Sequence, residues 1–227
     1  MRQRRAFYLF ILLMIASVPV MGQYQDLQLW SSVWIRADIT PKLRVGLEEE
    51  ARFFENISLL DKLNSDLTVD YEIFDRIRIG LLYRLITNRE KEGDYTLKQR
   101  FGVSLGAEKL KGPWKLGAIV KFQTTYDEFY HSDDWYLPKN YFRVEGEISR
   151  LLNRNRTEPY ATLEWWYFMP QGQQAFFDQY RLTLGVKHKL AKDHRINVYY
   201  RIQQEIRVKD PLFAHILGIG YLFTWRR

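Results

Sequence analysis

The chain has 227 residues and no cysteine, which excludes disulfides, cysteine-ligated zinc and thiol chemistry. Its formal net charge is +7, with 34 Lys and Arg against 27 Asp and Glu, and 16% of its residues are aromatic. The mean hydropathy of −0.38 excludes a bundle of membrane helices, since each helix would need about 20 predominantly apolar residues. A membrane β-barrel stays compatible with this composition, because its strands alternate apolar and polar residues.

The first 22 residues predict a secretory signal peptide. Three arginines among the first five residues are followed by an apolar run, residues 6–18, and by Val20 and Gly22 ahead of a cleavage site. Removal of residues 1–22 lowers the net charge from +7 to +4 and leaves 23–227 as a single domain. No run of five or more like charges remains, so we expect no nucleic-acid partner.

The rest of the chain alternates apolar and polar residues with the period of a β-strand. Leu67, Val69 and Tyr71, for example, alternate with Thr68 and Asp70. The same alternation predicts eleven strands, at 27–39, 43–55, 64–74, 77–88, 95–109, 114–127, 140–151, 158–168, 177–190, 195–208 and 212–225.

These predicted strands are long enough to cross a bilayer, which takes about 9–11 residues of tilted strand. The sequence therefore predicts an all-β fold, a single antiparallel transmembrane β-barrel of 10–12 strands with meander topology. Single-chain bacterial barrels have an even number of strands. We therefore expect residues 23–39 either to hold two short strands, which gives twelve, or to lie outside the wall, which leaves ten. A soluble periplasmic barrel or sandwich is the structural alternative.

The predicted connections alternate between short turns and longer polar loops, as in outer-membrane barrels with periplasmic turns and extracellular loops. The expected turns lie at 40–42, 74–76, 110–113, 152–157 and 191–194, and the expected loops at 56–63, 88–94, 129–139 and 169–176. Aromatic residues near strand ends predict the two interfacial girdles of such a barrel. They are Trp30, Phe53, Tyr95, Trp114, Tyr126, Trp165, Tyr180 and Trp225.

One residue conflicts with this scheme. Glu49 falls in the lipid-facing row of its strand, where a charge at the bilayer midplane would cost on the order of 2 kcal/mol or more. We expect a β-bulge there to turn Glu49 inward.

Three segments resemble a known family. They are Leu47–Asn56 (LEEEARFFEN), Tyr95–Leu105 (YTLKQRFGVSL) and Tyr141–Ser149 (YFRVEGEIS), and they are similar to the outer-membrane family called domain of unknown function 2490. The resemblance extends over most of the mature chain. It implies an outer-membrane barrel, and it implies no catalytic residue.

The polar rows of the strands face the lumen if the apolar rows face lipid. These rows carry charges of both signs in nearly equal number. They are Glu48, Glu50, Arg52, Asp66, Asp70, Glu72, Arg78, Arg84, Lys98, Arg100, Glu108, Lys115, Lys121, Arg143, Glu145, Glu147, Glu164, Arg181, Lys187, Arg201, Glu205 and Arg207. A small barrel filled with such residues predicts a lumen of ion pairs that hold the wall in register, since unpaired buried charge is costly. We therefore expect a structural or envelope role.

Two other functions stay open. Six arginines on neighbouring strands could form a narrow channel for small or anionic solutes, because guanidinium groups bind carboxylate and phosphate. They are Arg78, Arg84, Arg100, Arg181, Arg201 and Arg207. A barrel-embedded lipid-modifying enzyme would have to use the loop residues 131–134, which include a histidine, a serine and two aspartates. Neighbours in a loop rarely adopt triad geometry, so we expect no enzyme.

The sequence suggests neither a cofactor nor a metal site, since it has no His-x-x-x-His and no EF-type loop. The expected partners are outer-membrane lipid, lipopolysaccharide and the barrel-assembly machinery, with a small solute in the channel alternative.

Overall fold

The structure is a computed structural model, and it describes residues 24–90, 93–127, 138–208 and 211–226. The predicted signal peptide lies outside these ranges. Among the described residues, no helix has the length and apolarity that a membrane-spanning helix needs.

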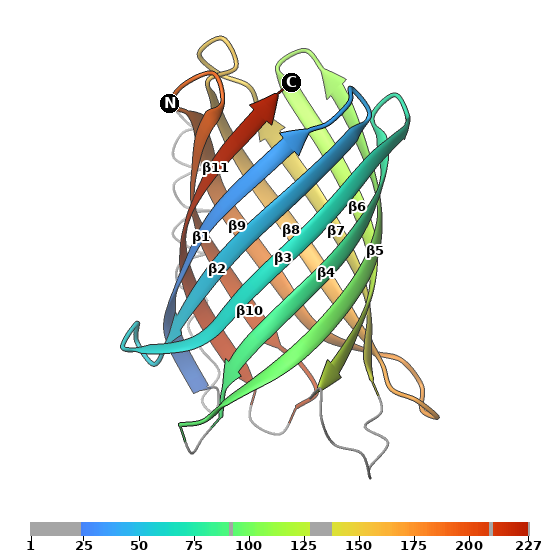
Figure 1. Ribbon diagram of the computed structural model, residues 1–227. Helices are drawn as coiled ribbons and strands as arrows, with labels where there is room; N and C mark the ends of the chain where they lie inside the picture. The colour runs from blue at the N-terminus through green and yellow to red at the C-terminus, as the bar shows by residue number, and fades with distance from the viewer. Residues whose placement is uncertain (1–23, 91–92, 128–137, 209–210, 227) are drawn as a thin grey trace, which may run out of the picture.

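The described chain consists of strands of 12 to 17 residues joined by short connections (Figure 1). The strands are β1 (Tyr24–Asp38), β2 (Leu43–Phe54), β3 (Leu59–Phe74), β4 (Ile77–Arg89), β5 (Tyr95–Lys111), β6 (Trp114–Asp127), β7 (Lys139–Arg150), β8 (Thr157–Met169), β9 (Phe176–Lys189), β10 (His194–Glu205) and β11 (Leu212–Arg226). Most ends agree with the alternation to within three residues. β3 begins five residues early, so the predicted loop at 56–63 is a turn at 55–58.

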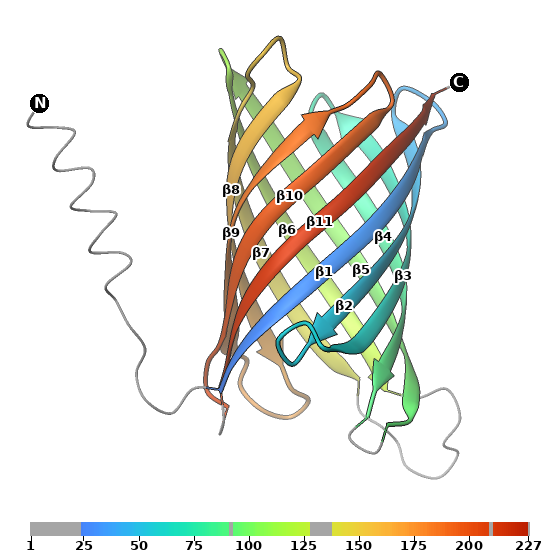
Figure 2. The same cartoon turned by 90° about the vertical axis from the view of Figure 1, so that its left-hand side faces the viewer.

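The strands form a closed barrel in which neighbours along the chain pair antiparallel. The barrel closes between β1 and β11, which run parallel with Tyr24 opposite Leu212 and Asp38 opposite Arg226 (Figure 2). An odd number of strands in a meander makes this parallel pair unavoidable, because the first and last strands then point the same way. The predicted all-β meander barrel is confirmed, and the eleven strands of the described chain lie within the predicted range of 10–12. The expectation of an even number, ten or twelve, is wrong, because residues 24–38 are one strand of the wall.

The two ends of the barrel differ in their connections. The turn end, at the top of Figure 1, carries the connections 39–42, 75–76, 112–113, 151–156 and 190–193. The loop end carries 55–58, 90–94, 128–138, 170–175 and 206–211, parts of which lie outside the described ranges. β1 starts at the loop end and β11 finishes at the turn end (Figure 2).

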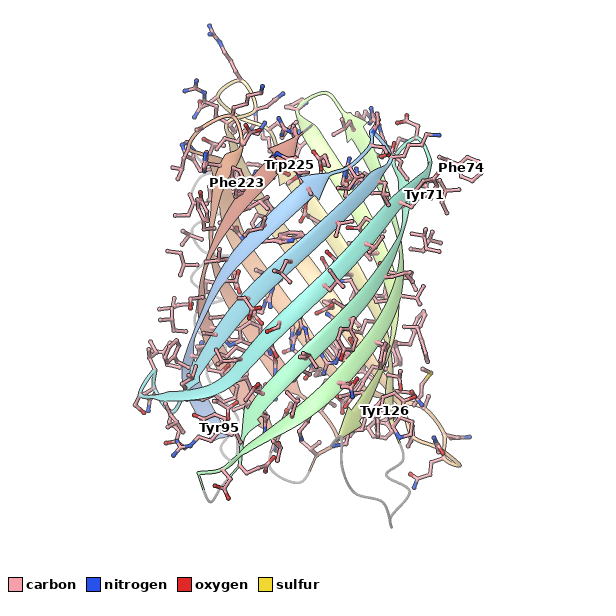
Figure 3. All side chains as sticks on the ribbon, viewed as in Figure 1. Tyr71, Phe74, Tyr95, Tyr126, Phe223 and Trp225 are labelled. Carbon is pink, nitrogen blue, oxygen red and sulfur yellow. The ribbon has the colours of Figure 1, made fainter. Side chains whose placement is uncertain are left out.

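The outer surface of the barrel is apolar along the length of its strands. Leu81, Leu105 and Leu184 are each more than half exposed. Aromatic side chains project outward near both ends, with Tyr71, Phe74, Phe223 and Trp225 at the turn end and Tyr95 and Tyr126 at the loop end (Figure 3). Of the predicted girdle residues, Trp30 is misplaced. It belongs to the inward row of β1 and is 3% exposed, because the face of a strand residue follows from its position in the alternation and not from its distance to the strand end.

The bulge expected at Glu49 is absent from β2. The register between β2 and β3 shifts at Arg52/Phe53 instead, and Glu49 stays in the outward row opposite Ser65. The Ser65 hydroxyl donates a hydrogen bond to Glu49 Oε2 at 2.7 Å. The carboxylate is therefore exposed on the apolar surface with one polar partner.

Inside the barrel, large inward side chains lie over glycines of the neighbouring strand. Tyr199 of β10 is opposite Gly218 of β11, and a Cβ at Gly218 would overlap the tyrosine ring. Tyr199 also packs against the small apolar cluster of Trp30, Ala214 and Ile216. The lumen is thus partly filled by aromatic rings that need glycine beside them.

Candidate functional site: the charged lumen

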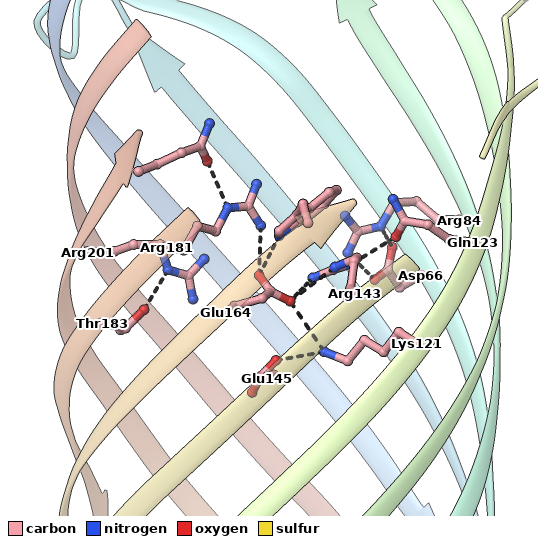
Figure 4. Close-up of polar contacts among 12 residues, drawn as sticks. Asp66, Arg84, Lys121, Gln123, Arg143, Glu145, Glu164, Arg181, Thr183 and Arg201 are labelled. Atoms are coloured by element: carbon pink, nitrogen blue, oxygen red, sulfur yellow. Dashed lines mark hydrogen bonds and ion pairs between the residues drawn. The ribbon is translucent and has the colours of Figure 1, made fainter. Parts of the chain in front are cut away.

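A network of ion pairs crosses the middle of the lumen around Glu164 of β8 (Figure 4). Arg143 from β7 donates two hydrogen bonds to Glu164 Oε1. Arg181 from β9 lies 3.5 Å from Oε2, and the Trp166 indole N–H donates to Oε2 at 2.9 Å. Lys121 from β6 lies 2.8 Å from Glu145 and 3.9 Å from Glu164. Glu164, only 5% exposed, therefore joins cations from three strands.

Two further pairs extend this network around the wall. Arg84 of β4 binds the buried Asp66 carboxylate of β3 in a bidentate arrangement, with both N···O distances at 2.5 Å. Arg52 donates to Glu50 two residues away at 2.8 Å, and Asn64 donates to the same carboxylate. We call the set Asp66, Arg84, Arg143, Glu164 and Arg181 the central charged layer. Bidentate guanidinium–carboxylate pairs fix geometry as well as charge.

Two tryptophans face the lumen beside this layer. Arg52 stacks over the Trp30 ring with its guanidinium carbon 3.7 Å from the ring centroid. Arg143 and Arg181 stack over Trp166 at 3.8 and 4.4 Å. An aromatic face attracts a cation through its quadrupole. The rings therefore fill space in the lumen and also hold its arginines.

The turn end of the lumen holds two adjoining cavities that share Trp34 and Lys187 in their lining. The turn-end cavity, of about 340 Å³, is lined by four cationic and four anionic side chains. Most of these charges have partners: Arg78 lies 3.0 Å from Glu108, and Lys187 lies 2.8 Å from Glu147. The second, of about 350 Å³, includes Arg201.

The loop end holds a separate cavity of about 290 Å³, and none of its lining residues lines the two turn-end cavities. We call it the loop-end cavity. Its floor includes the central-layer residues Arg84 and Arg181 with Trp30 and Trp166. Among the described residues, the cavities at the two ends are therefore lined by separate sets of side chains, and Arg84 and Arg181 of the central charged layer belong to the loop-end set.

The predicted lumen residues are distributed over these regions. Arg84, Arg143 and Arg181 belong to the central layer, where Lys121 and Glu145 adjoin it. The turn-end cavities take Arg78, Arg201, Glu48, Glu50, Asp70, Glu145 and Glu147, and Glu72 pairs with Arg78 beside them. Arg100 and Glu205 line the loop-end cavity.

Arg207 is the exception. The prediction placed it in the last third of a strand at 195–208, but β10 ends at Glu205. Arg207 is exposed in the following connection with φ of 61°. A left-handed backbone residue cannot continue a strand, so the row of six arginines on neighbouring strands is broken at this position.

The charge pattern did not identify the neutral members of the site. Trp30 and Trp166 hold the arginines, Thr125 and Thr183 accept from Arg100 and Arg201 at 2.9 Å, and Gln123 accepts from Arg143 at 2.8 Å. All of them sit in polar rows of the alternation, which is the signal that could have found them.

The lumen shows no arrangement typical of a metal centre within the described ranges, where no three His, Asp or Glu side chains cluster. The loop residues 131–134 of the enzyme alternative lie outside the described residues.

Comparisons with known proteins place the chain in a family. The family described as "Protein of unknown function (DUF2490)" matches residues 27–211, from β1 to the connection before β11. The chain belongs to this family. No curated protein matches this DUF2490 chain.

Two solved structures are similar to the DUF2490 chain in outline. The outer-membrane expressed OmpT of Vibrio cholerae has 12% identity and a TM-score of 0.42, with 72% of this chain covered and 54% of the other, so this chain spans about half the length of OmpT. The β domain of the Bordetella autotransporter BrkA has 16% identity and a TM-score of 0.43, with 75% and 79% covered.

Proposed function

We propose that this DUF2490 protein is an integral outer-membrane barrel whose lumen is closed by the central charged layer, with a structural role in the envelope. Three features support the membrane setting. The closed wall leaves no sheet edge with unpaired backbone groups. The outer face is apolar. Strands of 12 to 17 residues exceed the length that a bilayer requires, about 9–11. The turn end would then face the periplasm.

The single observation that carries the closed lumen is the position of Glu164. Its carboxylate binds side chains from β6, β7 and β9 at once, and the cavities on its two sides share no lining residue. Opening the lumen here would separate buried charges from their partners, which is strongly unfavourable. The layer therefore supports the wall and blocks the bore.

The proposed partners follow from the outer face. Lipid and lipopolysaccharide would contact the apolar wall and its aromatic bands. The final strand, β11, ends with Tyr221, Phe223 and Trp225 in its outward row, and a C-terminal aromatic strand of this kind is what the barrel-assembly machinery would bind during insertion. We expect no enzymatic activity, so phospholipid and lipopolysaccharide should stay intact when incubated with the purified protein.

Membrane insertion is tested by extraction and electrophoresis. We expect the protein to need detergent for extraction, and to migrate differently in gels before and after heating. Extraction in buffer alone would contradict the membrane proposal and support a soluble periplasmic barrel.

Closure of the lumen is tested by conductance in planar bilayers. We expect no conductance from the wild-type protein with small anions or neutral solutes, and conductance events from Glu164→Ala, in which the layer loses its shared carboxylate. Glu147→Ala, at the turn-end cavity, is the matched control and should stay silent. Steady wild-type conductance selective for anions would overturn the closed lumen and support the channel alternative.

A further inference from the structure

The loop-end cavity has an unusual charge balance. Among the described residues that line it, seven are Lys or Arg and one, Glu205, is acidic. The turn-end cavity, by contrast, has four of each. A concave site with an excess of one sign concentrates its field on a ligand of the opposite sign.

Pairing within the wall accounts for several of these cations but not for Arg100. Arg84 binds Asp66, and Arg181 approaches Glu164. Arg100 of β5 donates one hydrogen bond, from Nε to the Thr125 hydroxyl at 2.9 Å. Within the described ranges no carboxylate lies within 4.0 Å of its guanidinium, so its terminal nitrogens are available.

The surroundings of Arg100 destabilise its charged guanidinium when no ligand is bound. Burial removes it from water, and the positive charges of Arg84, Arg143 and Arg52 repel it, with the Asp66 carboxylate opposing them in part. Buried donors are usually satisfied, and an anion in the cavity would satisfy the terminal nitrogens of Arg100.

From these observations we infer that the loop-end cavity binds a small oxyanion of the phosphate class, held by the terminal nitrogens of Arg100. Five of the seven cations already lie within 4.0 Å of carboxylates outside the lining, whereas Arg100 has no such partner in the described chain, so its charge is the one that favours an anion. The volume of about 290 Å³ exceeds that of one phosphate and leaves room for the organic part of a phosphate monoester. The inference rests on the proposed closed lumen, which makes the cavity a binding site instead of a passage.

The experiment measures phosphate binding by calorimetry in detergent, with inorganic phosphate and a sugar phosphate as probes at constant ionic strength. We expect saturable binding to the wild-type protein. Arg100→Gln should weaken it about 10- to 100-fold, the range expected for the loss of charge-assisted hydrogen bonds of about 1.5–3 kcal/mol. Arg100→Lys keeps the charge without the planar pair of donors, so its phosphate affinity should lie between those of the wild type and Arg100→Gln.

Arg201→Gln is the matched control. Arg201 also donates Nε to a threonine at 2.9 Å and also lacks a carboxylate within 4.0 Å in the described chain, but it lines a turn-end cavity. Its substitution should change the phosphate affinity less than twofold. Equal losses in both variants would overturn the site, as would absence of binding to the wild-type protein.

A second readout separates a binding role from a merely structural one. Loss of Arg100 removes like-charge repulsion, so Arg100→Gln should unfold at a temperature equal to or above that of the wild type, while phosphate should raise the Tm of the wild type only. Stronger binding of citrate than of either phosphate probe would overturn the phosphate class.

The proposed function fails separately. Anion-selective wild-type conductance together with phosphate binding would overturn the closed lumen and leave Arg100 as a ligand for the passing ion. A wild-type protein that shows neither conductance nor phosphate binding would overturn the phosphate site alone.

Discussion

The two ends of the lumen use charge differently. In the turn-end cavity of about 340 Å³, cations and anions are equal in number and share partners: Lys115 lies within 4.0 Å of Glu108, Glu147 and Glu158. At the loop end the cations outnumber the acids, and Arg100 has only a threonine as its hydrogen-bond partner in the described chain. Balanced pairing stabilises a wall. Uncompensated charge lowers stability and is retained where a ligand supplies the missing partner.

The largest effect on the free energy of unfolding is expected from a substitution in the central charged layer, which lies between these ends. Glu164→Ala leaves Arg143 and Arg181 buried without their carboxylate, and breaking a buried pair in this way costs about 3–5 kcal/mol. Glu147→Ala removes a partly exposed partner of Lys187 and Lys115, and exposed pairs are worth about 0–1 kcal/mol. Urea unfolding of both variants in lipid vesicles measures the difference. Equal losses would show that the layer is no more critical than the turn end.

An intermediate effect on the free energy of unfolding is expected from substitution of two arginines that line opposite cavities. One substitution should lower it, and the other should leave it level or raise it. Arg78→Gln removes ion pairs to Glu72 and Glu108 and should lower the free energy of unfolding by about 1 kcal/mol. Arg100→Gln removes no ion pair within the described ranges and relieves repulsion, so stability should stay level or rise. If both variants lose stability equally, the distinction between paired and uncompensated ends is wrong.

The sequence predicted the wall well, because the period of the strands depends on local alternation. The strands 77–88 and 114–127 are within one residue of β4 and β6. The start of β3 was missed because its pairing with β2 is irregular there: Arg52 is opposite Lys62 and Phe53 is opposite Leu60, so Asp61 is an extra residue that interrupts the alternation. The parallel closure was missed because the count of strands is a property of the whole barrel.

The site was less predictable than the wall. Alternation assigns a residue to a face, but the stagger between strands decides which residues on that face meet. Glu164 and Arg143 come from adjacent strands, yet they are offset by two residues in the register, since Arg143 is opposite Trp166 and Glu145 is opposite Glu164. The alternation within one strand gives no information on this offset between strands.

The smallest effect tests whether partners at the turn end are redundant. Lys187 lies 2.8 Å from Glu147, but Lys115 lies 3.8 Å from the same carboxylate. Lys187→Gln should therefore lower the free energy of unfolding by less than about 0.5 kcal/mol, within the range of partly exposed pairs. The combination with Lys115→Gln should cost more than the sum of the two, because Glu147 then loses both cations. A double-mutant cycle in urea measures this coupling. Strict additivity would mean that the two lysines act independently, and that the balance of charge at the turn end does not rest on shared partners.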